Sequence, residues 1–272
     1  MRALVLGAGG MLGQDVMRAL DADDAVGLTH SELDITDAAA VRAAVVDAAP
    51  DVVFNCAAYT KVDGAESEPE RAMLVNGEAA GIVAAAAPAV LYVSSDYVFD
   101  GRKGAPYVES DETGPVSSYG RSKLAGELAT AEANPRHLIV RSSWLFGAGG
   151  RNFVDTMLRV GRERDEARVV ADQVGCPTYT GHLAHGLLRV ASGGSYGIHH
   201  VAAAGSCSWY ELAAAAFERA GVDCRLEPIT TDQYPLPAPR PAYSVLGTER
   251  QPLLPPWQDG LDAYLAEREV HA

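Results

Sequence analysis

The stretch Arg2-Ala3-Leu4-Val5-Leu6-Gly7-Ala8-Gly9-Gly10-Met11-Leu12-Gly13 decides the fold of this chain. A short apolar run ends in glycine, and helical periodicity follows from Met11 to Leu20. This order of strand, glycine turn and helix is typical of a unit that binds the diphosphate of a dinucleotide. The spacing G-x-x-G-x-x-G differs from the usual G-x-G-x-x-G, and a plain strand–helix turn is the alternative interpretation. The N-terminal position in an α/β chain favours cofactor binding, with Gly7, Gly10 and Gly13 shaping the loop.

Strand and helix patterns alternate after this unit. Buried strands are expected at 25–29, 51–57, 89–95 and 137–143, with helices between them. The alternation predicts an α/β fold, a Rossmann-like doubly wound parallel sheet. The alternation of strands and helices becomes irregular after Trp144. Residues 1–146 are therefore expected to form an NAD(P)-binding domain, and residues 181–203 are expected to return to it. Residues 147–272 are expected to form mainly a smaller C-terminal substrate-binding lobe.

Composition narrows the classes of function. The chain has 272 residues, a formal net charge of −14 and a sequence pI of about 4.8, which disfavours binding to nucleic acid. No apolar run approaches the ~20 residues of a membrane span, so we expect no membrane association and a cytoplasmic protein. The four cysteines form no CxxC pair. The histidine pairs His182/His185 and His199/His200 have no third potential metal ligand near them in the sequence. We therefore expect reduced thiols and no metal site.

Three residues predict the chemistry. Tyr119 and Lys123 are four residues apart, so they share one face of a helix, and Ser95 ends a neighbouring strand. A tyrosine has an ordinary pKa near ~10, which a nearby ammonium should lower. Tyr119 would then donate a proton while a hydride reaches a carbonyl carbon, with Ser95 bonded to the carbonyl oxygen. Tyrosine and lysine at this spacing are common on surfaces, but the glycine loop and the strand-end serine make the combination specific.

The end of the second strand bears on the choice of cofactor. The tip reads Thr29-His30-Ser31, with no carboxylate before Glu32. An NAD-selective site usually ends this strand with an acidic residue for the ribose 2′-hydroxyl, so a 2′-phosphate would be tolerated here. NADPH is the expected cofactor and NADH a further candidate, with His30 and Ser31 bonding the 2′-phosphate; the alternative is that they are loop residues only. Further along the expected cofactor path lie Asp34, Ile35, Ala57 and Ala58.

Several segments resemble the dTDP-4-dehydrorhamnose reductase family, within the extended short-chain dehydrogenase/reductase superfamily. The glycine loop and the Ser95/Tyr119/Lys123 set match the superfamily. The narrower resemblance runs from residue 7 to about 246 and lies in Asn55–Glu66, Ser94–Gly101, Arg141–Trp144, Asn152–Phe153, Asp172–Thr178 and Arg240–Ser244.

The resemblance implies NAD(P)H-dependent reduction of the C4 ketone of dTDP-4-keto-L-rhamnose, so the C-terminal lobe would bind a dTDP-sugar. Tyr119 would donate the proton with Lys123 as its partner. Ser95 stands where the family often has threonine, and the swap keeps the hydroxyl. Asp96 and Trp144 match positions that touch the sugar or nucleotide. The positions that match cofactor contacts are Gly10, Met11, Leu12, Asp34, Ile35, Ala57, Ala58 and Tyr59.

Two arginines are candidate partners of the substrate diphosphate, because a guanidinium binds that anion in a bidentate manner. They are Arg240 and Arg141, and a structural ion pair explains Arg141 equally well. A homodimer is one candidate assembly, and the sequence does not decide the oligomeric state.

Other functions stay open at this point. A sister dehydratase would need an acidic residue directly after Asp96, where this chain has Tyr97. A 4-epimerase usually has small residues after the strand-end serines, where this chain has Asp96-Tyr97. Reduction of another dTDP-keto sugar, such as a streptose-type precursor in an antibiotic-sugar pathway, fits the same motifs. A non-catalytic NADP-binding regulatory subunit is the alternative from another class, and the intact Ser95, Tyr119 and Lys123 argue against it.

Overall fold

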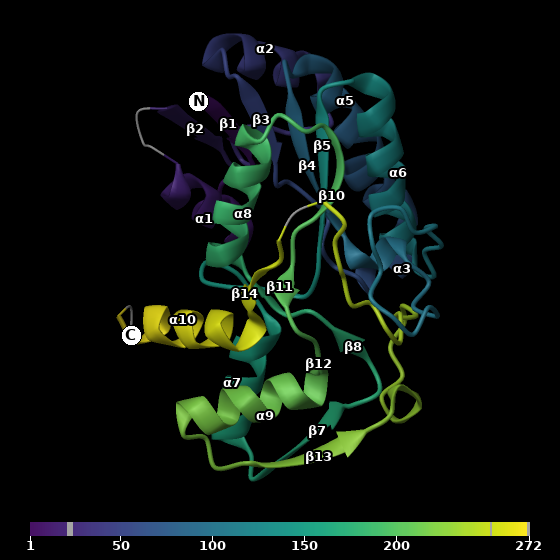
Figure 1. Ribbon diagram of the computed structural model, residues 1–272, viewed down its shortest axis with the longest axis vertical. Helices are drawn as coiled ribbons and strands as arrows, with labels where there is room; N and C mark the ends of the chain where they lie inside the picture. The colour runs from purple at the N-terminus through teal and green to yellow at the C-terminus, as the bar shows by residue number, and fades with distance from the viewer. Residues whose placement is uncertain (21–23, 251, 271–272) are drawn as a thin grey trace.

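The computed structural model describes residues 1–20, 24–250 and 252–270. Within these residues, six strands form one parallel sheet in the order β10-β5-β4-β3-β1-β2 (Figure 1). The order reverses between β1 and β3, and ligands bind at the carboxyl ends of the strands beside such a reversal. The strands are β1 (Ala3–Leu6), β2 (Ala25–Leu28), β3 (Val52–Asn55), β4 (Val90–Ser95), β5 (His137–Ser142) and β10 (Gly197–His200).

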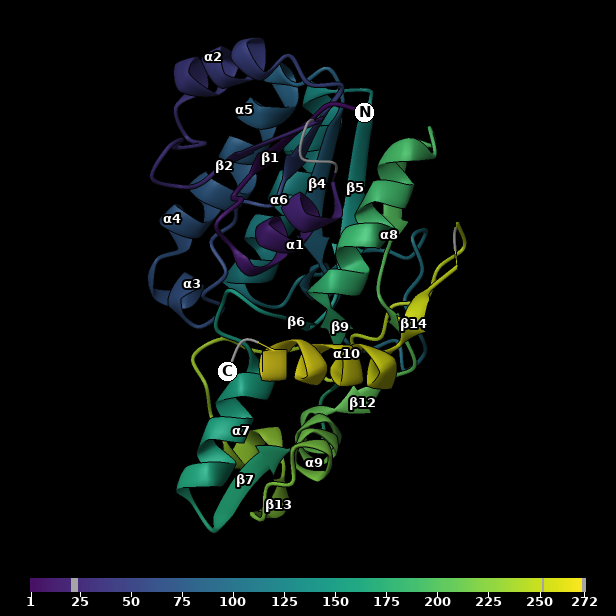
Figure 2. The same cartoon turned by 90° about the vertical axis from the view of Figure 1, so that its left-hand side faces the viewer.

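Helices cover both faces of the sheet (Figure 2). Ala3 and Val5 of β1 pack in a core with α1 and α8, whereas Leu4 and Leu6 pack on the opposite face with α2 and α5. Burial on both faces explains why the strand is apolar throughout instead of alternating. The helices of this half are α1 (Met11–Ala19), α2 (Ala38–Ala48), α3 (Gly64–Ser67), α4 (Pro69–Met73), α5 (Ala79–Ala86), α6 (Ser118–Ala133) and α8 (Thr180–Ser192).

The helical stretch that begins at Pro69 is interrupted. A π-helical turn, η2 (Leu74–Glu78), separates α4 from α5 and contains the buried Asn76. The Asn76 amide accepts from the Tyr59 N–H (2.8 Å) and donates to the Tyr59 carbonyl (3.0 Å) and to the Ser122 hydroxyl (3.0 Å). The widened turn therefore ties the loop after β3 to α6.

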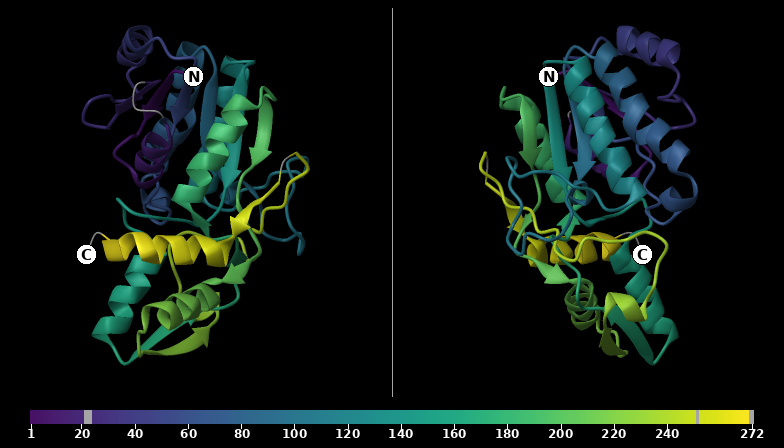
Figure 3. Two further views of the ribbon diagram at one scale, coloured as in Figure 1. Left: turned by 60° about the vertical axis from the view of Figure 1, so that its left-hand side comes forward. Right: turned by 90° about the vertical axis from the view of Figure 1, so that its right-hand side faces the viewer.

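The rest of the chain builds a smaller lobe around a second apolar core (Figure 3). Strands β7 (Glu166–Val170) and β13 (Arg225–Ile229) pair in parallel, and α7 (Phe153–Glu163), α9 (Trp209–Ala220) and α10 (Trp257–Val270) contribute to this core. The stretch 228–256 holds the end of β13, the 3₁₀ turn η4 (Thr231–Gln233) and the short strand β14 (Leu254–Pro256). The shorter elements are β6 (Leu145–Phe146), β8 (Val174–Gly175), β9 (Thr178–Tyr179), β11 (Ala203–Ala204), β12 (Cys207–Ser208), β14 (Leu254–Pro256), η3 (Asp96–Val98) and η4 (Thr231–Gln233).

A buried ion pair joins α6 to β5. The Arg141 guanidinium donates to both carboxylate oxygens of Glu127, at 2.9 and 2.7 Å, and the Ser94 hydroxyl donates to the same carboxylate. Both charged side chains are 3% exposed. Arg141 is therefore a structural residue, and the hypothesis that it binds a substrate diphosphate is wrong. No helix in the described part of the chain is long and apolar enough to cross a membrane.

Replacing Glu127 by alanine should lower the free energy of unfolding by about 3–5 kcal/mol, because Arg141 would stay buried without a partner. Glu163→Ala is the control, since it breaks the exposed pair with Arg159 and should cost less than ~1 kcal/mol. Urea denaturation of both variants measures the difference. Equal losses in the two variants would contradict a structural role for the Glu127–Arg141 pair.

Candidate active site

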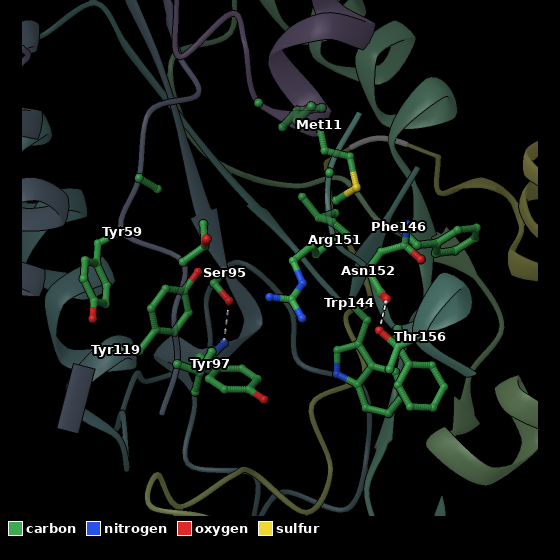
Figure 4. Close-up of a pocket in the computed structure, with 18 of the residues that line it drawn as sticks. Met11, Tyr59, Ser95, Tyr97, Tyr119, Trp144, Phe146, Arg151, Asn152 and Thr156 are labelled. Atoms are coloured by element: carbon green, nitrogen blue, oxygen red, sulfur yellow. Dashed lines mark hydrogen bonds between the residues drawn. The ribbon is translucent and has the colours of Figure 1, made fainter. Parts of the chain in front are cut away.

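One cleft lies beside the carboxyl edge of the sheet and extends into the lobe (Figure 4). Its cavity volume is about 2240 Å³, whereas a site for one small ligand holds ~300–1,000 Å³, so there is room for a dinucleotide and a second ligand. Apart from Arg141, the sequence-predicted site residues line it. They are Gly7, Gly10, Met11, Leu12, Gly13, His30, Ser31, Asp34, Ile35, Ala57, Ala58, Tyr59, Ser95, Asp96, Tyr119, Lys123, Trp144 and Arg240.

The glycine loop has the close packing that a dinucleotide site needs. Gly7 has a φ of +76°, and a Cβ on Gly13 would lie only 2.2 Å from the Gly7 carbonyl oxygen. Gly10 caps α1 without a side chain, which leaves the first N–H groups of the helix facing the cleft. Such a helix start binds a diphosphate, so this part of the chain fits NADPH.

The tip of β2 is folded around Glu32. The Thr29 N–H and hydroxyl both donate to the Glu32 carboxylate, at 2.8 and 2.6 Å, and these bonds lower the pKa of Glu32. The carboxylate is thus turned back onto the loop, whereas His30 and Ser31 line the cleft. This arrangement leaves room for a 2′-phosphate beside two polar side chains.

Lys123 projects from α6 towards β4 and is buried. Its Nζ donates to the Val93 carbonyl (2.7 Å) and lies 4.2 Å from the centre of the Tyr92 ring. Burial lowers the pKa of Lys123 to about 7, although the Glu127 carboxylate one turn further along α6 opposes this shift. The ammonium is therefore close to its titration point at neutral pH.

The prediction that Lys123 lowers the pKa of Tyr119 is wrong in this state of the protein. Burial raises the pKa of Tyr119 to about 12, and the nearby Asp96 carboxylate adds to the rise. A hydrogen bond with Ser95 acts in the opposite direction but is weaker. The Lys123 ammonium donates to the Val93 carbonyl and is not among the groups that shift the pKa of Tyr119.

Asp96 is a buried carboxyl surrounded by hydroxyls. It accepts from Ser95 (3.0 Å) and Ser143 (3.1 Å), and Ser244 provides a third hydrogen bond. Burial raises the pKa of Asp96 to about 6 in spite of these bonds. The neighbouring Tyr97 ring packs edge-on against the Tyr119 ring, with 5.7 Å between the ring centres.

Trp144 is held in a strained conformation at the boundary of the lobe. Its φ is +48°, its ring stacks on Trp209 at 3.4 Å, and a Cβ on Gly175 would lie 2.4 Å from it. Trp209 is thus a residue that sequence reasoning missed, although its aromatic type at the start of a helix was visible.

Arg240 lies in the cleft with its guanidinium already paired. It donates to both oxygens of the Asp63 carboxylate, at 2.9 and 2.7 Å, which lowers the pKa of Asp63. The geometry therefore does not support Arg240 as a free partner of a substrate diphosphate. A second cation that sequence reasoning missed, Arg151, points into the same cavity (Figure 4).

The thiols are a further class of reactive group. The four cysteines are free thiols. Cys56 faces the cleft, and burial raises the pKa of its thiol to about 12. Among the described residues, no group of three or more His, Cys, Asp or Glu side chains is placed to hold a metal ion.

The parallel sheet, the glycine loop and the converging Ser95, Tyr119 and Lys123 define an oxidoreductase of the Rossmann-fold short-chain dehydrogenase/reductase type. A family model described as RmlD substrate binding domain matches residues 1–270. A dTDP-4-dehydrorhamnose reductase of Burkholderia thailandensis is 44% identical over 92% of this chain and 91% of that protein. The chain therefore belongs to the dTDP-4-dehydrorhamnose reductase family.

Two further relatives bear on cofactor and substrate. The crystal structure of a dTDP-4-dehydrorhamnose reductase from Bacillus anthracis, in complex with NADP, superposes with a TM-score of 0.94 at 37% identity, covering 98% of this chain and 99% of that one. A protein of Streptomyces antibioticus described as a probable dTDP-4,6-dihydroxy-2-methyloxan-3-one 4-ketoreductase is 43% identical over 92% of this chain and 88% of its own length.

The buried Asp96 predicts a pH-dependent contribution to stability. Its folded pKa of about 6 lies above the unfolded value near ~4, so the contribution is present at low pH and lost as the pH rises through about 6. Relative to Asp96→Asn, the wild type should therefore lose roughly 1–2 kcal/mol of unfolding free energy between pH about 4.5 and 7.5. Urea unfolding at both pH values tests this, and parallel profiles would show that Asp96 titrates normally.

Proposed function

We propose that this protein reduces the C4 ketone of dTDP-4-dehydro-L-rhamnose with NADPH and yields dTDP-L-rhamnose. The observation that carries the proposal is the convergence of Ser95, Asp96 and Tyr119 in a cleft that also contains the glycine loop. The membership of the chain in a family of such reductases supports the same substrate class.

Tyr119 is the proton donor in this proposal. With a pKa of about 12 the phenol is protonated at neutral pH, so it begins the reaction with the proton that a ketone oxygen must gain. Ser95 interacts with the phenol and would hydrogen-bond the same ketone oxygen. Bound NADPH supplies the hydride. The developing phenolate would then be stabilised by the positive charge of Lys123 one helical turn away.

The remaining predicted residues divide into cofactor and sugar contacts. Gly10, Met11 and Leu12 would hold the cofactor diphosphate, and His30 and Ser31 would receive the 2′-phosphate. Asp96 and Trp144 would contact the sugar. Residues 1–146, with 181–203, would act as the cofactor domain and 147–272 mainly as the lobe for the sugar nucleotide. Cytoplasmic location and a homodimer stay predictions.

Reduction of a different dTDP-keto sugar is the second candidate. The Streptomyces antibioticus relative, whose described substrate is another 4-keto sugar, is nearly as similar as the rhamnose-pathway relative, at 43% against 44% identity. Purified protein should be offered dTDP-4-dehydro-L-rhamnose generated in situ, with NADPH and in parallel with NADH. We expect NADPH oxidation and formation of dTDP-L-rhamnose.

The other outcomes separate the alternatives. Inertness with this sugar together with reduction of another dTDP-keto sugar would move the protein to a specialised pathway. Cofactor binding without turnover of any dTDP-keto sugar would favour a non-catalytic regulatory subunit.

Tyr119→Phe should lower kcat by roughly 10²- to 10⁴-fold, because the ring remains but the transferable proton is removed. The dissociation constant for NADPH should change less than about threefold, which fluorescence titration measures. Tyr97→Phe is a matched control, since this neighbouring ring also loses a hydroxyl. A Tyr119→Phe enzyme with the wild-type rate would refute Tyr119 as the proton donor.

A further inference from the structure

Arg151 is held at the junction of the two halves of the cleft. It lies in the turn between β6 and α7, where Gly149 packs on Gln14 and Gly150 on Met11, with a Cβ at these positions 2.4 and 3.1 Å from those side chains. Gln14 in turn donates to the Gly9 carbonyl (2.9 Å). The backbone of the turn is thus fixed against the glycine loop.

The residue after Arg151 anchors the turn on its other side. Asn152 caps α7 by accepting from the Asp155 N–H (2.9 Å), and its amide donates to the Gly147 carbonyl (3.0 Å) and the Tyr264 hydroxyl (2.9 Å). With both neighbours fixed, the direction in which the Arg151 side chain leaves the backbone is set by the fold.

The Arg151 guanidinium is available for a ligand. It extends into the cavity between Ser95 and Trp144 (Figure 4). The residue is exposed, and within the described ranges no hydrogen bond or ion pair engages the guanidinium.

Most of the other cations that line the cleft are already engaged. Lys123 is bonded to the Val93 carbonyl, and three arginines are paired with carboxylates. These pairs are Arg240 with Asp63, Arg71 with Glu68, and Arg168 with Glu227. Arg164 also lines the cleft, but it follows the far end of α7, roughly 20 Å along the helix axis.

A cleft that holds NADPH and a dTDP-sugar must accommodate two diphosphates. The first has the N–H groups at the start of α1, so it needs no cation from the chain. The second would enter a protein with a formal charge of −14, beside the buried Asp96. A guanidinium between the reacting residues and Trp144 offers the bidentate donors that a diphosphate prefers.

We propose that Arg151 binds the diphosphate of the sugar nucleotide and thereby places the sugar between Trp144 and Tyr119. The inference rests on the proposed function only for the identity of the nucleotide. It makes Arg151 a substrate-binding residue that does not contact the cofactor diphosphate.

The test compares Arg151→Gln with Arg162→Gln, which removes the same charge from an exposed position on α7 outside the cleft lining. Calorimetry measures binding of dTDP, thymidine and NADP to the full-length protein. In the wild type dTDP should bind at least about tenfold more tightly than thymidine. Arg151→Gln should abolish most of this preference, Arg151→Lys should keep part of it, and Arg162→Gln should match the wild type.

Kinetics give a second readout. For the keto sugar, KM should rise roughly tenfold in Arg151→Gln while kcat changes less than about threefold, because binding energy is lost without loss of the proton donor. The affinity for NADP should stay within about threefold of the wild type.

The outcomes separate this inference from the proposed function. An unchanged preference for dTDP, or a loss of NADP affinity in its place, would overturn the role of Arg151 even if the wild type reduces the keto sugar. A wild type that is inert with keto sugars, yet shows a dTDP preference dependent on Arg151, would refute the proposed function and support the inference. A wild type that does not bind dTDP would overturn both.

Discussion

The close packing of α6 against β4 is the constraint on which the site depends. Gly126 makes it sterically feasible, since a Cβ there would lie 2.3 Å from the Tyr92 hydroxyl oxygen of β4, and Gly120 allows the same close approach to the turn after β4, where a Cβ would lie 2.2 Å from the Tyr97 carbonyl oxygen. The buried Arg141–Glu127 pair and the bond from Lys123 to the Val93 carbonyl then hold the helix in place. The two glycines allow the close contact, and the two polar interactions fix the position of the helix along the sheet. Together they hold the first turn of α6 over the cleft.

This packing also sets the electrostatics of the site. Burial moves the pKa of Lys123 down to about 7 and that of Tyr119 up to about 12, so the folded protein disfavours charge on both groups. Asp96 follows the same rule, because burial outweighs its hydrogen bonds and raises its pKa to about 6. As a result, the buried phenol of Tyr119 keeps its proton at neutral pH.

Features set by neighbouring residues in the chain could be predicted from the sequence. The alternating strands and helices, the glycine turn and the four-residue spacing of Tyr119 and Lys123 all depend on neighbours in the chain, and the predicted parallel sheet is confirmed. Side-chain contacts between residues far apart in the chain could not be predicted. Arg240 is paired with Asp63 across 177 positions, and Asn76 in the π-helical turn is bonded to the backbone of Tyr59 across 17 positions. Contacts between such distant residues leave no repeating pattern in the sequence from which they could be predicted.

The sequence by itself determined the class of fold and the place of the dinucleotide loop, and it put the proposed reacting side chains on one helix and a neighbouring strand end, because backbone geometry and helical spacing are properties of short segments. Only the tertiary structure decided which groups carry charge and which cations are free. Protonation depends on how far folding removes a group from water, and pairing depends on which distant segments meet. For this reason Tyr119 was recognisable from its spacing, whereas its raised pKa, and the fact that Arg151 has no partner among the described residues, became visible only in the folded chain.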